Sequence, residues 1–496
     1  MIAAALVYPL LFIAVALLRL SYPFELEWME GGVLEQVERV LRGQPIYVAP
    51  SLAYVPFDYT PLYFYLAALP ARLLGPGFPA LRLAALIASL GCLVLIFALV
   101  WRETRDGAAG LFAACLFAGT YRLSGAWFDI ARPDSLFLLL VLAGIIAYRF
   151  GPRGARGGAL AGALLALAFF AKQTALTVAA PIALHALLTD RRRFAGFAGA
   201  LAVLVGGGTW LLDLLHGGWF RYYVFGVALG HSPELALVPQ FWTRDLMAHL
   251  PIAVLLAAFF LLVPRAVRIE GPGPASGTVA GARPMGRGFY LAVAAGFLGS
   301  SGWLRSFRVC YDNVLMPGHA GLAILAGLGW HSIGAWIGTA PERPRASLQR
   351  FVGLALFAQL ALLAYDPVAQ IPTRADRRAG ERLIENLRRS PGDVLVPSHS
   401  YLAARAGKAP HFHEVALMDV LKRRGSGAIE RGLREELDRA LQAKRWAALV
   451  LDTRDWLRDE AEPYYQPGWP AFDSDTVFWT RTGMLTRPEA VLVPRR

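Results

Sequence analysis

Residues 83–100 read LAALIASLGCLVLIFALV, an uninterrupted apolar stretch without a charge. A helix needs about 20 such residues to cross the hydrocarbon core of a bilayer, so this stretch predicts a membrane-spanning helix. Apolar runs recur along the first 366 residues, at 1–18, 107–121, 135–147, 157–171, 173–189, 194–212, 246–263, 288–304, 313–340 and 351–365. The sequence therefore predicts an all-α polytopic membrane protein with about eleven transmembrane helices.

The composition supports this class. Charged residues make up 17% of the chain and hydrophobic residues 56%, whereas a soluble domain averages about 25% charged residues. The first run has no basic segment before it and no small-residue cleavage site before Arg19, and further runs follow it. We therefore expect a retained helix rather than a signal peptide.

The net charge of +13 indicates topology rather than nucleic-acid binding, because the basic residues lie in short loops between apolar runs. Residues 60–75 contain Pro70 and Arg72 and suit a helix along the membrane surface. If they do not span, one side of the membrane carries a large basic excess, and the positive-inside rule identifies it as the cytoplasm. The basic residues on that side are Arg102, Arg105, Arg149, Arg153, Arg156, Arg191, Arg192, Arg193, Arg265, Arg268, Arg283, Arg287, Arg343, Arg345 and Arg350. The N-terminus is then cytoplasmic, and the external parts are 21–80, 122–133, 213–245, 304–312 and everything after residue 366.

The last part of the chain has a different pattern. Residues 374–389 and 427–442 have the pattern of charged, amphipathic helices, and DVLVP (393–397) and WAALVLD (446–452) have that of short buried strands. We therefore predict two domains, a transmembrane domain at 1–366 and a small external α/β domain at 367–496.

The first external loop begins SYPFELEWMEGGVLEQVERVLRG at residue 21 and is rich in glutamate. Its apolar spacing predicts an amphipathic helix at 31–42 on the membrane surface, with Glu35 and Glu38 on the solvated side. Glu27 and Glu30 precede that helix, so either carboxylate is a candidate catalytic group. The alternative is an acidic helix N-terminus that satisfies the helix dipole.

Two further external positions carry candidates. Asp134 follows Arg132 in WFDIARPDSLF and either acts in the site or caps the next helix. Lys172, in FFAKQTAL, is the only lysine before residue 367. A charge at a membrane boundary is a functional hypothesis by default, and the alternative is a lysine that reaches out to the interface.

The segment WLRSFRVCYD, residues 303–312, places two arginines among aromatic residues at an external membrane edge. Arg308, with Arg305 as a weaker candidate, suits a lipid phosphate because arginine stays charged and binds phosphate with two donors. Interfacial anchoring is the alternative. His319, a little further along, is expected to be a packing or polar-contact residue.

Other chemistries lack their sequence signals. The three cysteines show no CxxC-type spacing, which argues against a disulfide framework or a thiolate metal site. No Walker A motif, HExxH, or GxGxxG after a strand is present, which argues against ATP hydrolysis and dinucleotide chemistry.

Together these motifs resemble the GT-C superfamily of membrane glycosyltransferases, in particular the protein O-mannosyltransferase and aminoarabinose-transferase type. The resemblance covers about residues 1–330. The motifs that carry it are EWMEGG (27–32) leading to GQPIY (43–47), YTPLYFY (59–65), RPD (132–134), Lys172 after an alanine-rich helix, and the segment from Arg308 to Pro317. The chain departs from the family where Glu replaces the usual Asp, where Thr60 replaces a proline, and where Arg308 and Tyr311 are not adjacent.

The resemblance implies transfer of a hexosyl or pentosyl group from a polyprenyl-phosphate donor, on the external face and with inversion. One carboxylate, Glu30, Glu27 or Asp134, would be the general base. Lys172, Arg308, Arg132 and Tyr311 would bind the donor phosphate. The acceptor would be a lipid, a polysaccharide or a protein.

Some relatives use a divalent cation, so Mg²⁺ or Mn²⁺ bound by Glu27, Glu30 and Asp134 is a further expectation, although no cofactor is required. The rival function is a transporter or flippase of a lipid-linked intermediate, which would need polar residues deep in several helices. A non-catalytic scaffold is a third alternative. Arginine-rich, lysine-poor usage suggests a GC-rich bacterial genome, and hence the bacterial inner membrane.

Overall fold

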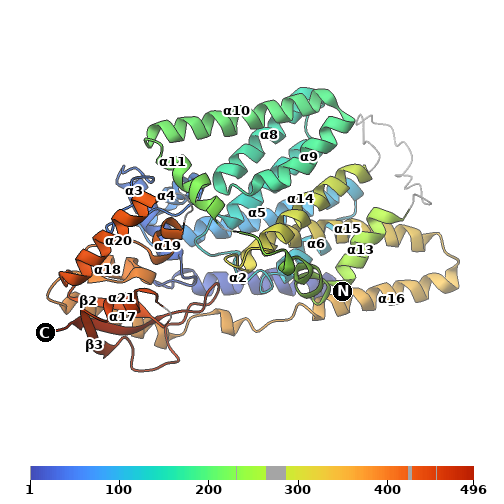
Figure 1. Ribbon diagram of the computed structural model, residues 1–496. Coiled ribbons are helices and arrows are strands. Elements are labelled where there is room, and N and C mark those ends of the chain that lie inside the picture. Colours follow the sequence, from blue (N-terminus) through green and yellow to red (C-terminus); the bar gives the residue numbers. More distant parts are fainter. Residues whose placement is uncertain (1, 231, 264–285, 423–426, 454) are drawn as a thin grey trace.

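The computed structural model describes residues 2–230, 232–263, 286–422, 427–453 and 455–496. A bundle of long helices forms most of the molecule (Figure 1). A smaller unit that contains the sheet lies at one end of the bundle, beside α3 (Glu30–Leu41) and α4 (Leu62–Leu74) (Figure 1). The expected cytoplasmic residues Arg265, Arg268 and Arg283 lie outside the described residues.

Each of the predicted apolar runs contains a helix. The helices of the bundle are α1 (Ile2–Ala5), α2 (Val7–Leu20), α5 (Phe78–Thr104), α6 (Gly107–Gly119), α7 (Asp134–Phe150), α8 (Gly154–Ala171), α9 (Ala175–Thr189), α10 (Arg191–Leu215), α13 (Pro251–Leu262), α14 (Arg287–Arg305), α15 (Met316–Gly338) and α16 (Glu342–Ala361). Glycine allows the closest approach between two of them: a Cβ on Gly158 of α8 would lie 2.0 Å from the backbone oxygen of Arg193 in α10. Small residues at such crossings are typical of membrane helix packing.

Among the described residues, five helical segments are long and apolar enough to cross a bilayer, namely Ile2–Leu20, Phe78–Thr104, Gly154–Ala171, Arg191–Leu215 and Asp312–Gly338. Leu235–Met247 and Pro251–Leu262 meet at 100° and would make a sixth if they form one broken span. The prediction of a mostly helical fold with membrane-type helices and a small sheet is confirmed. The number of eleven crossings stays a prediction.

The segment 60–75 forms α4, which has 13 residues. At 1.5 Å per residue it is about 20 Å long, too short for a hydrocarbon core of about 30 Å. Since α6 has the same length and lies in a predicted span, length alone does not decide, and the surface position of α4 stays a prediction.

Helix α3 covers Glu30–Leu41, close to the predicted 31–42. The expectation that Glu35 is solvated is wrong. Its side chain is half-buried and its Oε1 is closed off from solvent, because α18 (Tyr401–Arg405) of the C-terminal unit packs against α3. Burial raises the pKa of Glu35 to about 8.

The C-terminal unit contains the two predicted helices, α17 (Arg374–Arg389) and α20 (Gly427–Gln442). Its sheet has the order β1-β2-β4-β3, with β1 and β2 parallel and the other pairs antiparallel. Strands β1 (Val394–Leu395) and β2 (Ala448–Asp452) lie within the predicted strands. Strands β3 (Tyr465–Pro470) and β4 (Pro488–Pro494) were not predicted, because both contain prolines, which remove a ladder donor and argue against a strand.

Short elements complete the chain. They are α11 (Trp219–Arg221), α12 (Val238–Gln240) and the π-helical turns Tyr222–Val227 and Phe241–Met247 between α10 and α13, and α19 (Glu414–Lys422) and α21 (Leu457–Ala461) in the C-terminal unit.

Buried apolar residues form two clusters. The first lies within the helical bundle. The second is shared, because residues of the first loop and α4, such as Phe57, pack with residues of the C-terminal unit, such as Trp446. The domain boundary at residue 366 stays a prediction, since this second core draws on both sides of it.

Candidate active site

Glu27 is fully buried, on the loop before α3. Its Oε2 accepts hydrogen bonds from the guanidinium of Arg132 at 3.1 Å and from the N–H of Met29 at 3.2 Å. Its Oε1 has no partner within the described part of the chain. Burial raises the pKa of Glu27 to about 8, against the opposing effect of Arg132. Glu27 therefore offers an enclosed carboxyl oxygen with a high affinity for a proton.

Arg132 lies in the loop between α6 and α7 and is nearly inaccessible. It donates to the hydroxyl of Tyr59 at 2.5 Å, and its guanidinium lies 4.9 Å from the centre of the Tyr59 ring. Its Nε–H is buried and without an acceptor in the described structure. Arg132 thus keeps one donor available beside Glu27.

Asp134 is the first residue of α7 and is paired with a lysine. Its Oδ1 accepts from Nζ of Lys172 at 2.5 Å and from Nδ2 of Asn313 at 2.9 Å. Its Oδ2 is buried and has no partner among the described residues. The side chain makes no cap bond at the start of α7, so the cap alternative is not supported. Lys172 is 11% exposed and is held by Asp134 rather than extended into the interface.

We call Glu27, Tyr59, Arg132, Asp134, Lys172 and Asn313 the Glu27 cluster. It joins residues from the first two predicted external loops to the C-terminal end of α8 and the start of the segment before α15. Buried polar atoms are normally satisfied, yet this cluster holds three that are not: Glu27 Oε1, Arg132 Nε and Asp134 Oδ2. Two acceptors and one charged donor are therefore available for a ligand.

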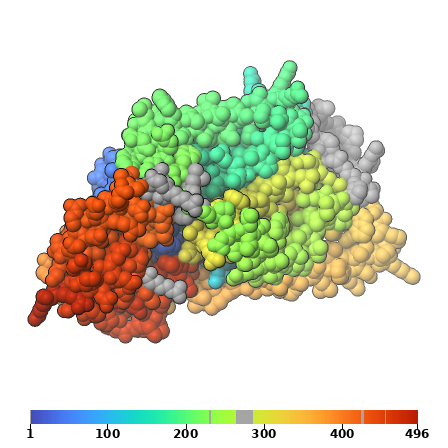
Figure 2. Space-filling model, in the orientation of Figure 1, coloured from blue at the N-terminus to red at the C-terminus, as the bar shows by residue number. Residues whose placement is uncertain are grey.

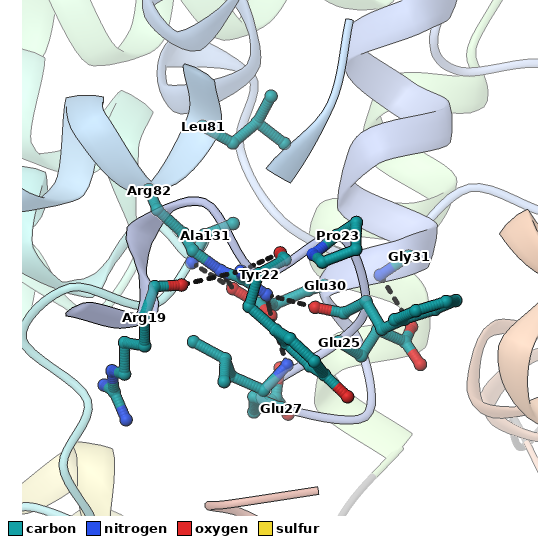
Figure 3. Close-up of polar contacts among 12 residues, drawn as sticks. Arg19, Tyr22, Pro23, Glu25, Glu27, Glu30, Gly31, Leu81, Arg82 and Ala131 are labelled. Atoms are coloured by element: carbon teal, nitrogen blue, oxygen red, sulfur yellow. Dashed lines mark hydrogen bonds and ion pairs between the residues drawn. The ribbon is translucent and has the colours of Figure 1, made fainter. Parts of the chain in front are cut away.

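Glu30 has the opposite environment. Its two oxygens accept from Nε and Nη2 of Arg82 at 2.9 and 2.6 Å, and from the N–H groups of Ala131 and Leu26 at 2.8 and 2.7 Å. Burial would raise the pKa of Glu30, but Arg82 and the two backbone donors lower it. Figure 3 shows these contacts converging from both loops.

Arg82, near the start of α5, completes what we call the Glu30–Arg82 hub. Its guanidinium also donates to the carbonyl oxygens of Tyr22 at 2.7 Å and Phe24 at 2.6 Å (Figure 3). Through Ala131 and Leu26 the hub ties the loop that carries Arg132 to the loop that carries Glu27. Its polar groups are satisfied by the protein itself.

A second buried ion pair also supports the loop that carries Arg132. Arg19 of α2 donates to both oxygens of Asp129, at 2.7 and 2.5 Å, and to the carbonyl of Ala126 at 2.7 Å. Both side chains are almost fully buried. Two ion pairs, Glu30–Arg82 and Arg19–Asp129, therefore hold the loop that carries Arg132 without contacting Arg132 itself.

Arg308 is not brought into the cluster. Its side chain is 75% exposed and pairs with Glu234. Arg305 is less exposed and contacts Asp245 at 2.8 Å and Asp312 at 3.2 Å. Both arginines line a cavity of about 210 Å³ that also includes Cys310.

Tyr311 follows Cys310 of that cavity in the sequence and packs against Trp28, the residue after Glu27. The Tyr311 ring packs edge-on against Trp28, with ring centroids 6.0 Å apart. Burial is the main cause that raises the pKa of the Tyr311 hydroxyl, and the charge of Glu27 raises it further. In Figure 2 the surface is hollowed where the orange C-terminal unit meets the green and yellow helices, and blue atoms of the N-terminal part are visible at its base. His319 is buried and bonded to Ser124 at 2.9 Å, as expected for a polar-contact residue.

The expected metal ligands are not assembled. Within the described residues no three His, Cys, Asp or Glu side chains are placed to hold a metal ion. Both oxygens of Glu30 are taken by Arg82 and the backbone, so Glu27, Glu30 and Asp134 do not fit a shared cation. We derive no step through a metal.

Three residues of the site escape prediction from the sequence. Tyr59 and Asn313 belong to the Glu27 cluster, and Arg82 belongs to the hub. Tyr59 stands inside a recognised motif but carries no charge pattern. Asn313 and Arg82 are single polar residues at the ends of apolar runs, a position at which the sequence alone does not separate a ligand from an interfacial anchor.

Comparison with known proteins agrees with this fold. Residues 58–207 match the family model of dolichyl-phosphate-mannose-protein mannosyltransferase. ArnT from Cupriavidus metallidurans, in a structure bound to undecaprenyl phosphate, superposes with a TM-score of 0.59 and 13% identity over 98% of each chain. No curated protein matches the chain in sequence.

Two larger enzymes share the fold. The oligosaccharyltransferase AglB from Archaeoglobus fulgidus, in complex with an inhibitory peptide and a dolichol-phosphate, has a TM-score of 0.53 and 11% identity over 91% of this chain and 69% of its own. Arabinofuranosyltransferase AftD from Mycobacteria has a TM-score of 0.53 and 17% identity over 99% of this chain and 39% of its own. The resemblance to the GT-C superfamily is thereby confirmed, and the chain has that fold.

Proposed function

We propose that this GT-C-fold chain is an integral-membrane glycosyltransferase that moves a sugar from a polyprenyl phosphate to an acceptor hydroxyl. The observation that carries the proposal is the Glu27 cluster: Glu27 has a buried carboxyl oxygen without a partner in the described structure and pairs with the buried cation Arg132. Arg132 in turn interacts with Asp134, which holds the second cation, Lys172. A proton acceptor next to positive charge matches a reaction that removes a hydroxyl proton while a phosphate departs.

The donor class follows from the cations. Lys172 and Arg132 are nearly inaccessible to water, where a positive charge interacts strongly with an anion. ArnT and AglB were determined with undecaprenyl phosphate and dolichol-phosphate, respectively. These structures support a lipid phosphate as the group that Lys172 and Arg132 bind, with Tyr311 at its edge.

The proposed step is a single displacement. The acceptor oxygen bonds to the anomeric carbon, the bond from that carbon to the phosphate oxygen breaks, and the hydroxyl proton passes to Oε1 of Glu27. The electron pair of the broken bond stays on the polyprenyl phosphate, whose growing charge is stabilised by Lys172 and Arg132. Attack opposite the leaving group inverts the anomeric centre.

The three candidate carboxylates take different roles in this proposal. Glu27 is the base, because its free oxygen and raised pKa favour proton uptake. Asp134 orients Lys172 through the 2.5 Å pair. Glu30 has no free oxygen, because Arg82 and two backbone N–H groups occupy both of its oxygens. It therefore holds the two loops together.

The setting is proposed from the charge pattern. The Glu27 cluster would face the outside of a bacterial inner membrane, with the N-terminus in the cytoplasm and the C-terminal unit external. The acceptor would be a lipid, a polysaccharide or a protein that enters between the C-terminal unit and the helices, where the surface is hollowed (Figure 2).

The test is transfer of labelled sugar from a panel of polyprenyl-phosphate sugars to membrane acceptors by the purified protein. We expect label to leave one donor, with the opposite anomeric configuration in the product by NMR, and Glu27→Gln to abolish the transfer while the variant stays folded. If the wild type moves no sugar from any donor but carries the lipid across vesicle bilayers, the flippase alternative replaces this proposal.

A further inference from the structure

A buried chain of charged groups joins the Glu27 loop to the C-terminal unit. Glu25, two residues before Glu27, bonds through Oε2 to Nδ1 of His399. Nε2 of His399 lies 3.2 Å from Oδ2 of Asp452, at the end of β2, and that oxygen also accepts from the hydroxyl of Thr486. The side chains of Glu25, His399 and Asp452 are only 3%, 2% and 6% exposed.

The protonation of His399 determines the charge of the series Glu25–His399–Asp452. Burial would lower the pKa of His399, but Asp452 and Glu25 on its two nitrogens raise it well above its ordinary value. An imidazolium with one carboxylate on each nitrogen has both of its N–H donors satisfied. His399 is therefore clamped between two carboxyl groups from parts of the chain that are far apart in sequence, and burial raises the pKa of one of them, Glu25, to about 7.

Other ionisable groups of the C-terminal unit lie close to His399. Glu414 of α19 accepts from Ser398 at 2.6 Å and interacts electrostatically with both His399 and Asp452. Asp455 and His413 are also within electrostatic range of this chain, and burial keeps the pKa of His413 low, at about 3. The cations Arg132 and Lys422 act on His413 and Glu414, respectively, one group further away, so the carboxyl groups dominate the immediate surroundings of His399 and favour its protonated form.

The Glu27 loop is fastened to the C-terminal unit at several points around Glu25. On one side of Glu27, the N–H of Glu25 donates to the hydroxyl of Tyr401 at 3.3 Å. On the other side, Nε2 of His413 donates to the carbonyl oxygen of Trp28 at 3.2 Å. The carbonyl of Leu26 accepts from the N–H groups of Arg481 and Thr482 at 2.7 and 3.1 Å. Glu27 therefore lies on a short segment whose two flanks are held by the C-terminal unit.

We propose that His399 is a positioning residue: held by Asp452, it grips Glu25 and so fixes the direction in which Glu27 presents its free oxygen. This inference rests on the proposed function of Glu27 as the base. It makes the C-terminal unit a part of the catalytic centre, in addition to any contact with the acceptor.

The experiment compares His399→Gln with His411→Gln in the full-length protein. His411 is a matched control, because it is also buried in the C-terminal unit and hydrogen-bonded, to Nε1 of Trp446 at 3.0 Å, but it does not bond to the Glu27 loop. Asp452→Asn is the milder second variant, since it keeps a hydrogen-bonding group and removes only the charge.

We expect His399→Gln to lower kcat by about 10²-fold, the size expected from a misplaced catalytic group. The donor KM and the affinity for undecaprenyl phosphate should stay near wild type. Hydrogen–deuterium exchange should become faster in the peptide that contains residues 25–31, and Asp452→Asn should show the same pattern more weakly. His411→Gln should leave both kcat and the exchange of that peptide unchanged.

The proposal is overturned if exchange of that peptide is unchanged in both folded variants, or if His411→Gln produces the same changes as His399→Gln. The exchange measurement does not depend on turnover. If Glu27→Gln proves fully active, the proposed base is wrong, while faster exchange in His399→Gln still supports the fastening of the loop by His399.

Discussion

The Glu30–Arg82 hub and the Glu27 cluster lie side by side and are built from the same residue types, yet their polar groups are paired to different extents. In the hub, both carboxylate oxygens of Glu30 carry two bonds each. In the cluster, Glu27, Arg132 and Asp134 each keep one buried atom unpaired. Since an unpaired buried polar atom costs about 1–3 kcal/mol, the cluster carries a local instability that the hub, a few residues away, does not have.

This contrast separates support from chemistry. Buried ion pairs that are fully bonded hold loops in place, whereas unpaired buried groups gain their partners only when a ligand arrives. Strain or instability of this kind concentrates at functional sites. Changes in the hub should therefore appear mainly in stability, and changes in the cluster mainly in turnover.

Glu27→Gln should have the largest effect on turnover. Loss of a general base lowers the rate by about 10²–10⁴-fold, and we expect this loss in kcat. The loss of stability should be smaller than for Arg82→Gln, because the pKa of about 8 keeps Glu27 largely protonated at neutral pH and the amide oxygen of glutamine can still accept from Arg132. Glu38→Gln, on the outer part of α3, is the control and should retain full activity. The measurements are sugar transfer and thermal unfolding of both variants. If Glu27→Gln and Glu38→Gln both transfer sugar at the wild-type rate, Glu27 is not the general base.

Arg82→Gln should have the largest effect on stability. It leaves Glu30 buried without its cation, and breaking one side of a buried pair costs about 3–5 kcal/mol. The check is thermal or denaturant unfolding of the purified protein in detergent. Arg42→Gln is the control, since Arg42 also pairs with a glutamate, Glu38, but its side chain is 58% exposed. Equal stability of the two variants would remove the distinction between hub and surface.

Lys172→Met should lower kcat by roughly 10²–10³-fold, the range seen when one preorganised donor to a developing anion is removed. Lys172→Arg keeps the charge next to Asp134 and should recover much of the activity. Binding of undecaprenyl phosphate, measured for both variants, shows whether the loss includes ground-state affinity. A methionine variant with wild-type kcat would mean that Lys172 only neutralises Asp134.

The pH dependence tests the raised pKa of Glu27, about 8. The base acts when ionised, so kcat/KM should rise by up to about tenfold per pH unit below pH 8 and level off above it. The same group has the opposite effect on stability: its folded pKa exceeds the unfolded value, so the folded state binds more protons and loses stability as pH rises from about 4.5 to 8. Glu27→Gln should flatten this part of the stability profile, and an activity that falls across the same range would exclude Glu27 as the base.

Arg308→Ala should have the smallest effect. The side chain is mostly exposed and its partner Glu234 is also partly exposed, and such surface pairs contribute little. We expect kcat and donor KM to stay within about twofold of wild type. A loss comparable to that of Lys172→Met would return Arg308 to the phosphate site that the sequence suggested.

The sequence predicts the long apolar helices, α3, α17 and α20 well, because each has a strong periodic pattern. It misses β3 and β4, whose prolines conceal the pairing of β4 with β2 (Ala448–Asp452) and of β3 with β4. It also brings Glu27, Arg132, Asp134 and Lys172 together as candidates, and the structure places these four in one cluster.

What the sequence could not separate is Glu27 from Glu30. Both precede the same amphipathic pattern, and only the position of Arg82, 52 residues beyond Glu30, determines which carboxylate is saturated. Likewise, Arg308 has the residue type and the setting of a phosphate ligand, but its side chain is 75% exposed and pairs with Glu234.

The core shared by the first loop and the C-terminal unit has a consequence for how the protein is made. The ribosome synthesises the first loop long before the C-terminal unit. Phe57 and its neighbours therefore remain without the other members of their buried cluster, such as Trp446, during most of synthesis. The Glu27 loop reaches its final form only after the residues that hold it, up to Thr482, have been synthesised. We expect a nascent or truncated chain that lacks these residues to insert into the membrane but to be inactive. Its first loop would also be accessible to proteases.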